Sequence, residues 1–545
     1  MSDPATPRMR WWGWGTDGHD PAVPDGLDAL LRAELGVDGR ATPPVALDEV
    51  RLPEPALAGE ARAALEAVVG VSFVRDDRAT RIAHATGRSY PDLVRLRSGD
   101  IECAPDAVVL PADADEVQRV LVVCAEHGVA VVPFGGGTSV VGGVEALRGR
   151  FGAVVALDLA RLDRLVAADP RSLTATLQAG VTGPEAERLL AAHGLTLGHF
   201  PQSFEFSTVG GWVATRSAGQ ASTGHGRIDE LVLGLECATP AGPVRALAVP
   251  ATAAGPDLRE LLVGSEGTLG VITEATLRVR PRPVAERYEA WAMPSFEAGA
   301  ETLRTLEQRG AAPDVCRLSD AEETRMVLAL AGRAGRALGA YLQTRGRPRP
   351  CLVIVGWDGP EDAVRRRRGE ARRILREGGA LRLGRRPGDA WQAGRFHGPY
   401  LRDVLMDRAV LVETLETATT WDRLQDLHAA VDAALRRSLG ERGTPPFVGC
   451  HISHLYPTGA SLYFTFVARQ EQDAELEQWR AAKAAAGAAI VATGGTITHH
   501  HAIGRDHAPW LGAEVGELGL EVLRAAKARL DPAGIMNPGK LVPDP

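Results

Sequence analysis

The stretch Val132-Pro-Phe-Gly-Gly-Gly-Thr-Ser-Val-Val-Gly-Gly143 decides the fold prediction. Its three consecutive glycines follow an apolar run and precede small hydroxyl residues, so the loop carries almost no side chain. Several backbone N–H groups of such a loop can converge on one anion, usually a phosphate or a diphosphate. The loop lacks the ending of an NTPase P-loop and does not open a helix as a dinucleotide-binding Gly-x-Gly-x-x-Gly motif does. Taken alone, it fits a tight turn between two strands equally well.

The residues around this loop have the pattern of an α+β domain. Residues 107–110 and 129–133 are predicted to be strands, with a helix between them that stops at Gly128. Residues 173–200 repeat the order strand, short helix, glycine stop and strand. We therefore expect two α+β halves whose loops face each other and clamp one long, bent ligand.

Two further segments are rich in glycine and hydroxyl residues. The first spans residues 201–219, and the second spans residues 263–273 and leads into the alternating strand 275–280. Pro281-Arg-Pro283 closes this part of the chain, and we place a domain boundary there.

Length and composition limit the classes of function. A chain of 545 residues is expected to form two or more domains, and 45% hydrophobic with 24% charged residues is typical of a soluble globular protein. No apolar run approaches the ~20 residues of a membrane span, and residues 1–7 lack the features of a signal peptide. Cytoplasmic residence is the default expectation.

Charge and cysteine content exclude further classes. A net charge of −8 argues against nucleic acid as a partner. The basic run Arg365–Arg368 is predicted to be a solvated helix face, although basic charge beside an apolar stripe also suits anionic lipid. The six cysteines are scattered without a Cys-x-x-Cys pair, so we expect core residues and neither disulfides nor a zinc site.

The triplet His499-His500-His501 follows a helix that is predicted to end at Gly494-Gly495. The three histidines fit polar residues at a strand end. A metal site is less favoured, because strand alternation would direct only the first and third the same way and no carboxylate is near in sequence. As a catalytic cluster, neutral imidazoles exchange protons near pH 7 and steady an anionic intermediate.

Tyr463 lies in the predicted strand Ser461–Val467. A period of two places Tyr463 and Thr465 on the face opposite Leu462, Phe464 and Phe466. A tyrosine in a strand is ordinarily a packing residue, but this alternation places the Tyr463 hydroxyl on the face opposite the apolar side chains.

The three glycine-rich elements, with the tail Leu530-Asp-Pro…Asn537-Pro-Gly-Lys540, resemble the FAD-binding domain of the vanillyl-alcohol oxidase/p-cresol methylhydroxylase superfamily. The resemblance implies an α+β fold with a two-part FAD-binding domain (101–283) and a cap or substrate domain (284–500). An N-terminal extension (1–100) precedes them, and a C-terminal segment (501–545) returns to the FAD-binding domain.

The resemblance assigns the cofactor contacts to the three glycine-rich elements. The implied FAD-contacting residues are Pro133, Phe134, Gly135, Gly136, Gly137, Thr138 and Ser139; Gln202, Ser203, Phe204, Glu205, Phe206, Ser207, Thr208, Thr215, Arg216, Ser217 and Ala218; and Glu266, Gly267, Thr268, Leu269, Gly270, Val271 and Ile272.

Some members of the superfamily attach FAD covalently to a histidine in or beside the first loop. Here Thr138 and Ser139 occupy that stretch, and no histidine or cysteine is close to it in sequence. His225 or a histidine of the cap domain is the alternative attachment point. We expect noncovalent FAD.

Within the superfamily, the chain most resembles the alkyldihydroxyacetonephosphate synthases, and this likeness extends through the cap domain. The motifs that carry it are Trp12-Gly-Trp-Gly15, Thr208–Val213, Tyr400-Leu-Arg-Asp403, Glu413–Thr417, Tyr456–Ala460, Leu462–Phe466 and the histidine triplet.

The synthase resemblance implies roles for the candidate site residues. The triplet belongs to the active site, and Tyr463 is the acid/base that removes the substrate proton. Because the reference pKa of a phenol is ~10, Tyr463 would need nearby His and Arg charges to act as a base. Arg402, otherwise a surface arginine paired with Asp403, contacts the substrate phosphate. Arg317 is a weaker candidate that supports the site near the flavin.

The implied reaction exchanges the acyl group of a 1-acyl dihydroxyacetone phosphate for a fatty alcohol, without net redox change, on reduced FAD. The rival is an FAD-linked oxidase or dehydrogenase of a 2-hydroxy acid. A flavin-storage protein fits poorly with so many ionisable groups at active-site positions. We expect a lipid or other small-molecule substrate, a homodimer, no metal, and either a cytoplasmic location or peripheral membrane contact.

Overall fold

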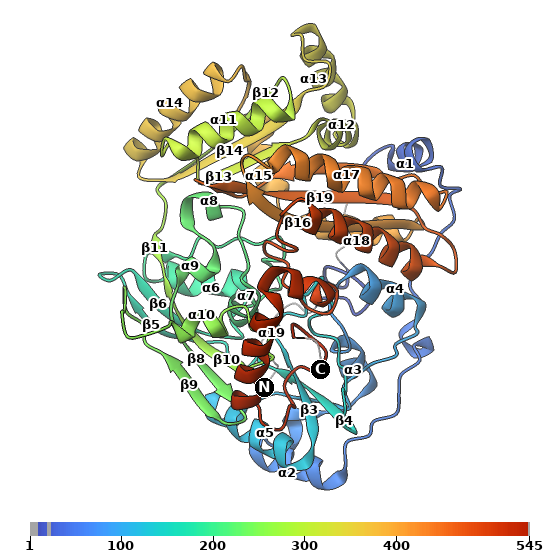
Figure 1. Cartoon of the computed structure of the whole chain (residues 1–545), viewed down its shortest axis with the longest axis vertical. Coiled ribbons are helices and arrows are strands. Elements are labelled where there is room, and N and C mark those ends of the chain that lie inside the picture. Colours follow the sequence, from blue (N-terminus) through green and yellow to red (C-terminus); the bar gives the residue numbers. More distant parts are fainter. Residues whose placement is uncertain (1–8, 19–22, 543–545) are drawn as a thin grey trace.

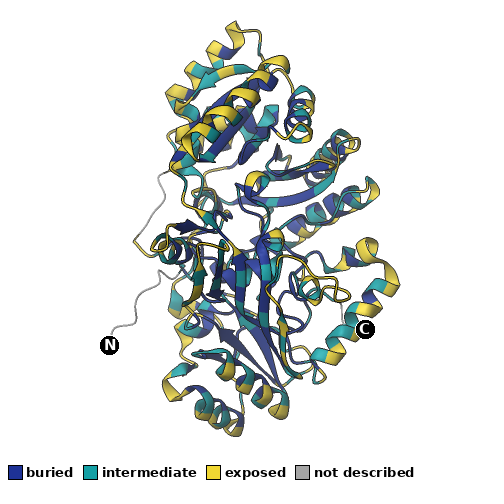
Figure 2. Cartoon of the chain, turned by 90° about the vertical axis from the view of Figure 1, so that its left-hand side faces the viewer, coloured by how far each residue is buried: buried dark blue, intermediate teal, exposed yellow. Residues whose placement is uncertain are grey.

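The computed structural model describes residues 9–18 and 23–542. The chain forms two parts that lie one above the other in Figure 1, with the smaller sheets in the lower part and one large sheet in the upper part. Figure 2 shows buried strands at the centre of each part and exposed helix surfaces around them. All six cysteines are free, and five of them are buried, as predicted.

The first sheet of the lower part presents the glycine loop. Its strand order is β1 (Val74–Arg75), β2 (Ala107–Val109), β4 (Ala153–Asp158), β3 (Val129–Phe134). β2 and β3 both run parallel to β4 and are joined by helix α5 (Ala114–His127), which packs beside them. The carboxylate of Asp113 caps α5 by accepting from the Glu116 N–H at 2.9 Å, and Gly128 ends it with φ 62°. The predicted strand–helix–strand unit is confirmed.

The second sheet is antiparallel. Its order is β5 (Leu165–Asp169), β6 (Thr174–Gln178), β10 (Val271–Arg278), β8 (Val232–Thr239), β9 (Gly242–Ala246). Helix α6 (Gly183–Ala191) follows β6, as predicted, but β7 (Leu195–Thr196) pairs with β11 (Arg280–Pro281) and not with this sheet. The second unit therefore repeats the order of elements without the parallel pairing, because a two-residue strand cannot extend the sheet.

The upper part is built on one eight-stranded sheet. Its order is β15 (Leu381–Gly384), β12 (Ala285–Met293), β14 (Cys351–Gly359), β13 (Val315–Ser319), β17 (Phe447–Ile452), β19 (Gly459–Arg469), β16 (Val410–Thr420), with β18 (Leu455–Tyr456) paired to β19. Helices α11 (Phe296–Gln308) and α14 (Glu361–Glu377) pack on the strands at one end, and α17 (Leu424–Glu441) packs on those at the other. Helix α18 (Glu475–Ala492) packs against α17 and β16.

The basic run on α14 is solvated only in part. Arg365 and Arg366 are exposed, but Arg367 forms an ion pair with buried Asp314 at 2.7 Å, and Arg368 forms one with Glu289, which is fully buried on β12. A buried carboxylate without such partners would be costly, so two of these arginines are structural. The prediction of a wholly solvated face is wrong for this reason.

The C-terminal segment returns to the lower part, as the resemblance implied. After helix α19 (Leu511–Leu530), the Val131 N–H donates to Ile535 at 2.8 Å and the Asn537 N–H donates to Val131 at 2.8 Å, which adds this segment to the edge of β3. The Asn537 side-chain amide donates to the carbonyl of Gly143 at 3.1 Å and to that of Glu266 at 2.7 Å. The tail therefore ties the first glycine-rich loop to the third.

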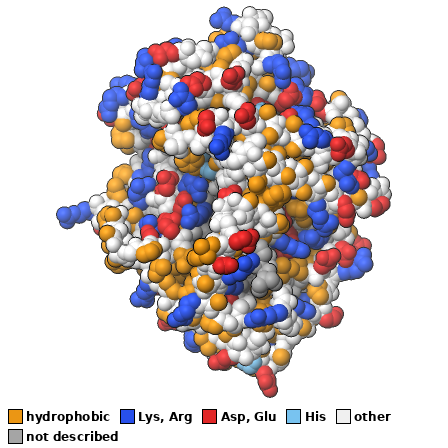
Figure 3. Space-filling view, in the orientation of Figure 1, with side chains coloured by type: hydrophobic (Ala, Val, Ile, Leu, Met, Phe, Trp, Pro, Cys, Tyr) orange, Lys and Arg blue, Asp and Glu red, His pale blue; other side chains and the backbone are white. Residues whose placement is uncertain are grey.

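The surface carries both signs of charge. Acidic and basic side chains are interspersed over the face shown in Figure 3. Over the residues that the structure describes, no helix combines the length and the apolar character that a membrane crossing needs.

Candidate active site

One cavity of about 640 Å³ lies where the three glycine-rich elements meet the cap sheet. This volume is in the range of sites that hold cofactors and small substrates. Most of the predicted FAD-contacting residues line it: Pro133, Phe134, Gly135, Gly136, Gly137, Thr138, Ser139, Gln202, Ser203, Ser207, Thr208, Thr215, Ser217, Ala218, Glu266, Gly267, Gly270, Val271 and Ile272.

Six residues of the predicted set do not line the cavity. Phe204 and Leu269 pack in the core of the second half of the lower part, and Phe206 packs in a core shared with the cap. The other three are engaged elsewhere: Glu205 with the Tyr400 hydroxyl, Arg216 with Glu260 and the Val263 carbonyl, and Thr268 with the Ser265 carbonyl. A role for these six in cofactor contact stays a prediction.

The first loop is a backbone cradle. A Cβ on Gly136 would lie 2.0 Å from the Phe206 carbonyl oxygen, and Gly137 has φ 65°, so neither position admits a side chain without strain. In the described ranges, the N–H groups of residues 136–139 donate to no protein acceptor. Free N–H groups that converge on a cavity fit a diphosphate, because buried donors need an acceptor.

The third element connects the cofactor cavity to the histidine triplet. The Glu266 carboxylate accepts from the N–H groups of Ile503 at 2.8 Å and Gly504 at 2.6 Å, just after the triplet. Burial raises the pKa of Glu266 to about 7 despite these two hydrogen bonds. The carboxyl therefore titrates near neutral pH.

The cap sheet contributes a tyrosine and a histidine that lie side by side. His451 of β17 is directly paired with Tyr463 of β19, and their rings stack with centroids 4.9 Å apart. Tyr463 and Thr465 line the cavity while Leu462, Phe464 and Phe466 are fully buried, which confirms the predicted alternation.

Arg317 lies in the wall behind this pair. It donates to Glu323 at 2.9 Å, and Glu323 also lies 2.9 Å from Nδ1 of His451. Burial opposes ionisation of Glu323, but His451 and Arg317 lower its pKa to about 2. Arg317 thus reaches the stacked pair through a carboxylate and also lines the cavity.

The histidine triplet is folded around one carboxylate. Glu416 of β16 accepts from the N–H groups of His500 at 3.0 Å and His501 at 2.6 Å, and also from the N–H of His499 and the hydroxyl of Thr498. Burial alone would raise the pKa of Glu416, but the imidazoles of the triplet and the His500 N–H lower it well below its usual range. The triplet forms a turn and not a strand end, so the strand-end interpretation is wrong.

The turn directs the three imidazoles differently. His500 and His501 line the cavity, with ring centroids 6.0 and 5.5 Å from that of Tyr463. His499 lies behind them, where its Nε2 is 2.6 Å from the Tyr456 hydroxyl and its Nδ1 is 2.9 Å from His500. Burial lowers the pKa of all three, which favours their neutral forms near pH 7.

His454 completes the group. Its ring stacks on His499 at 4.9 Å, and its Nδ1 is 2.5 Å from the Ser222 hydroxyl. Nitrogens of His454, His499 and His500 lie within 4.8 Å of one another. However, Nδ1 of His454 and both nitrogens of His499 already have hydrogen-bond partners, which favours proton exchange over metal ligation.

Arg402 lies on α16 (Gly398–Met406) and is buried at the cavity wall. It donates to Glu413 of β16 at 3.2 Å and to the Arg88 carbonyl at 3.3 Å. Asp403 does not pair with it and instead accepts from the Trp14 N–H at 2.7 Å. Arg402 is therefore a buried site residue and not a surface arginine.

The N-terminal motif Trp12–Gly15 packs against α16. A Cβ on Gly13 would lie 2.4 Å from the Asp403 carboxylate, and Trp14 lines the cavity. The close approach explains why glycine stands between the two tryptophans and how a segment before the first sheet reaches the site.

The chain matches two family models. Residues 105–248 match the model described as FAD binding domain, and residues 282–541 match FAD linked oxidases, C-terminal domain. The alkyldihydroxyacetonephosphate synthase of Dictyostelium discoideum is 32% identical over 98% of this chain and 94% of its own length. That of Trypanosoma brucei brucei is 33% identical over 100% of this chain and 94% of its own length. The protein belongs to the alkyldihydroxyacetonephosphate synthase family.

The fold agrees with this family membership. A solved alkyldihydroxyacetonephosphate synthase structure superposes with a TM-score of 0.85 at 30% identity and covers 98% of this chain and 99% of its own. The 4-ethylphenol oxidase of Gulosibacter chungangensis shares the fold, with a TM-score of 0.67 at 15% identity. The predicted α+β architecture is confirmed. The protein is an FAD-dependent enzyme, and its first loop has the free backbone donors that the FAD diphosphate requires.

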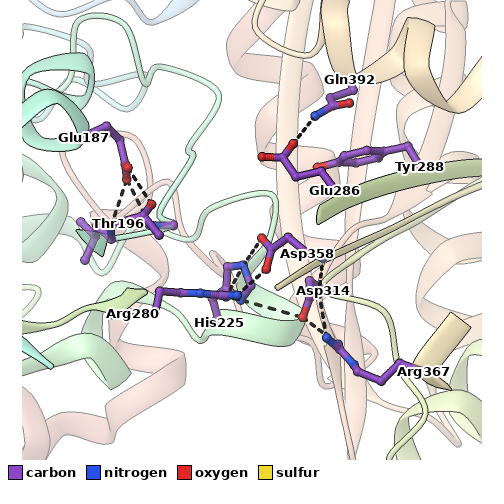
Figure 4. A network of polar contacts seen from close by, with 12 residues as sticks. Glu187, Thr196, His225, Arg280, Glu286, Tyr288, Asp314, Asp358, Arg367 and Gln392 are labelled. Atoms are coloured by element: carbon purple, nitrogen blue, oxygen red, sulfur yellow. Dashed lines mark hydrogen bonds and ion pairs between the residues drawn. The ribbon is translucent and has the colours of Figure 1, made fainter. Parts of the chain in front are cut away.

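In this family member, His225 holds a structural position. It does not line the cavity, and Figure 4 shows it between Arg280 of β11 and Asp358 of β14, with its Nε2 2.9 Å from the Asp358 carboxylate. Asp314 lies 3.9 Å from its other ring nitrogen and pairs with Arg367 at 2.7 Å. His225 therefore joins the two parts of the molecule, and noncovalent FAD stays our prediction.

Burial dominates the pKa of Tyr463. It raises the pKa above the ordinary value of a phenol, although Thr414 and Arg402 act in the opposite direction. The expected help from histidine charge is absent, because the neighbouring imidazoles are neutral. The protein alone therefore keeps this hydroxyl protonated.

Sequence reasoning missed four residues of the site. His451 and His454 were detectable as a His-x-x-His pair at the end of an apolar strand. Glu413 and Glu416 lay within a quoted motif, but their partners Arg402 and the triplet come from other segments, so no local pattern assigned them a role.

Proposed function

We propose that the protein exchanges the acyl group of a 1-acyl dihydroxyacetone phosphate for a long-chain alcohol and so forms an ether bond. One observation carries the proposal: Arg402, Tyr463, His500 and His501 line the same cavity as the FAD-binding loops. Similarity to alkyldihydroxyacetonephosphate synthases over nearly the whole chain supports the same conclusion.

Arg402 binds the substrate phosphate. Its guanidinium is buried, and a planar fork of donors suits phosphate oxygens. Glu413 holds the fork at 3.2 Å and compensates its charge when no substrate is present. The phosphate in turn places the first carbon of dihydroxyacetone near Tyr463.

Tyr463 and the neutral imidazoles of His500 and His501 move the substrate proton. The proton on C1 is removed before the carboxylate leaves, and it returns after the alcohol oxygen has bonded to C1. When bound, reduced FAD supplies a nucleophilic ring nitrogen for the exchange. The acyl group departs as a carboxylate and the alcohol loses one proton, so no net oxidation occurs.

The cavity also has an apolar arm for long chains. Leu27 and Leu31 of α1 (Leu27–Leu35) line it together with Met326 and Leu330 of α12 (Ala321–Leu330). An apolar wall next to a buried arginine suits a lipid with a charged head better than a small hydroxy acid.

The rival function is oxidation of a 2-hydroxy acid by an FAD-linked oxidase or dehydrogenase. The match of residues 282–541 to FAD linked oxidases supports it, and a buried arginine with a neutral histidine would serve a carboxylate substrate equally well. The homodimer, the cytoplasmic location and the membrane contact also remain predictions.

One experiment separates the two functions. Purified holoenzyme with reduced FAD is incubated with labelled hexadecanol and 1-palmitoyl dihydroxyacetone phosphate, and ether product, oxygen uptake and flavin absorbance are followed. We expect labelled ether without oxygen uptake. No ether, together with anaerobic bleaching of the oxidised flavin by D-lactate or a similar hydroxy acid, would overturn the proposal in favour of the rival.

A further inference from the structure

A second cavity, of about 370 Å³, lies behind the active site. Helices α4 (Tyr90–Ser98) and α18 form its sides, and residues 505–510 form its floor. Leu415 of β16 faces this cavity, whereas its neighbours Thr414 and Glu416 lie on the active-site side of the strand. The two cavities are therefore separated by one strand and one loop.

The walls of the second cavity are mainly apolar. The indoles of Trp479 and Trp510 face it together with Leu415, Ile490 and Ile497. A Cβ on Gly487 would lie 2.7 Å from the Trp510 ring, so the helix presents a glycine where this indole packs. Two aromatic planes beside aliphatic side chains form a slot that suits an alkyl chain.

One cation in this cavity has no carboxylate in direct contact. Arg95 and Arg505 each pair with Glu145, at 3.1 and 2.7 Å, and Arg480 lies 3.4 Å from Glu477. Lys483 is half-buried, and among the described residues its ammonium has no carboxylate within 4.0 Å. Its hydrogen-bond partner is Nε2 of His507 at 3.4 Å.

The surroundings of Lys483 favour an anion. Nδ1 of His507 lies 2.8 Å from the Ala502 carbonyl and so carries the proton, which leaves Nε2 as a weak, neutral acceptor for the lysine. Burial lowers the pKa of His507 to about 4, so the ring is not a competing cation. Burial raises the pKa of the nearby Asp506 carboxyl to about 7, although Lys483 acts in the opposite direction, so Asp506 gives Lys483 only part of a counter-charge at neutral pH.

The cavity is continuous with the active-site framework. The Trp479 indole donates to Glu413 at 2.6 Å, and the other oxygen of Glu413 accepts from Arg402. His507 is held by Ala502, the residue that follows the triplet. An occupant would thus touch the groups that position Arg402 and the histidine turn.

We propose that this cavity binds an amphipathic anion, with its charged head on Lys483 and its alkyl chain between Trp479 and Trp510. The head is a carboxylate or a phosphate ester, and the volume limits the chain to medium length. A half-buried ammonium without a contacting carboxylate, at the end of an apolar slot, suits a ligand that carries both a negative charge and an apolar body.

The test is calorimetric titration of the FAD holoenzyme with octanoate, and 1-octanol serves as the uncharged probe. Octanoate should bind, and 1-octanol should bind at least about tenfold more weakly, because a charge-assisted hydrogen bond contributes on that scale. A parallel titration with octyl phosphate identifies which head is preferred. Equal binding of octanoate and 1-octanol would overturn the proposal.

Two variants place the binding in this cavity. Lys483→Met keeps the length of the side chain and should weaken octanoate binding about tenfold. Ala484→Glu adds an acidic group at an exposed wall position and should weaken it as well, whereas Ala488→Glu, exposed on the same helix outside the cavity, should not. Flavin absorbance and the melting temperature report on folding. Octanoate binding that is unchanged in both Lys483→Met and Ala484→Glu would assign it to the active site and sink the proposal.

Discussion

The glycine loop 135–139 and the histidine turn 499–501 border the same cavity, but their backbones are used in opposite ways. In the glycine loop the N–H groups of residues 136–139 find no protein acceptor in the described structure, and side chains are nearly absent. In the histidine turn all three N–H groups donate to Glu416, and the side chains of His500 and His501 face the cavity.

Both segments are backbone nests that bind an anion. In the glycine loop the anion belongs to a ligand, whereas in the histidine turn it is the side chain of Glu416. The glycine loop waits for a ligand phosphate, so it binds through its backbone. In the histidine turn Glu416 already fixes the backbone, so the imidazoles of His500 and His501 can take part in proton transfer in the cavity. The comparison predicts that changes in the first region remove the cofactor, whereas changes in the second remove chemistry and leave the cofactor bound.

The largest effect is expected from Gly136→Ala. The added Cβ would lie 2.0 Å from the Phe206 carbonyl oxygen, so the loop must move and its N–H groups no longer converge. The purified variant should lack almost all flavin absorbance near 450 nm. Gly152→Ala is the control, because a Cβ there meets nothing within 4 Å. Full flavin content in Gly136→Ala would refute the backbone cradle.

The next largest effect is expected from Tyr463→Phe. Loss of the hydroxyl should lower the turnover rate by about 10²–10⁴-fold, the usual contribution of a positioned acid or base. The flavin content should not change, because Tyr463 belongs to the cap wall. Thr465→Val, on the same face of β19, removes a hydroxyl without a proposed proton-transfer role and should cost far less. Loss of FAD from Tyr463→Phe would contradict this prediction, because it would mean that a change in the cap wall also disturbs cofactor binding.

Glu416→Gln tests the internal anion of the histidine turn. The amide offers one acceptor oxygen where the carboxylate offers two, so at least one buried N–H loses its partner, at a cost of about 1.5–3 kcal/mol. The apparent melting temperature should fall. The turnover rate should also drop, because the imidazoles lose the positions that Glu416 fixes. Glu477→Gln, at an exposed ion pair, should leave both unchanged. An unaltered melting temperature for Glu416→Gln would mean that the turn does not depend on this carboxylate.

The smallest effect is expected from Glu266→Gln, at the junction of the two regions. Because burial raises the pKa of Glu266 to about 7, the folded protein holds a proton that the unfolded chain has released above the ordinary glutamate pKa. Rising pH therefore destabilises the wild type until the pH passes about 7, and the glutamine variant lacks this contribution.

The measurement is the melting temperature of both proteins between about pH 5 and about pH 8. Any advantage of the wild type should shrink as the pH rises. Glu260→Gln, which changes an exposed carboxylate that pairs with Arg216, is the control and should differ from the wild type by a constant amount. A constant difference for Glu266→Gln as well would contradict the raised pKa.

The two regions also differ in how far the sequence predicted them. The glycine loop was predictable because its cause is local: three glycines after a strand admit few other structures. The face of Tyr463 was predictable because strand alternation is local too. The role of Glu416 was not, because it lies 83 residues before His499 and no periodicity links them.

Other errors have the same origin. One interpretation placed the triplet at a strand end, but a distant carboxylate holds it in a turn. The second strand–helix–strand unit was expected to repeat the first, but β7 pairs with β11 and not with β6. Arg367 and Arg368 were expected in solvent, but the buried carboxylates of Asp314 and Glu289 form ion pairs with them. Each error concerns a partner chosen by tertiary contact.

The way the C-terminal segment closes on the lower part bears on the order of biosynthesis. Asn537 reaches Gly143 across 394 positions of sequence, and through Glu266 it reaches the segment that follows the histidines. While the chain emerges from the ribosome, the glycine loop exists long before the residues that secure it. We therefore expect tight flavin binding only after nearly complete synthesis. Bound flavin would then indicate that translation has passed residue 537.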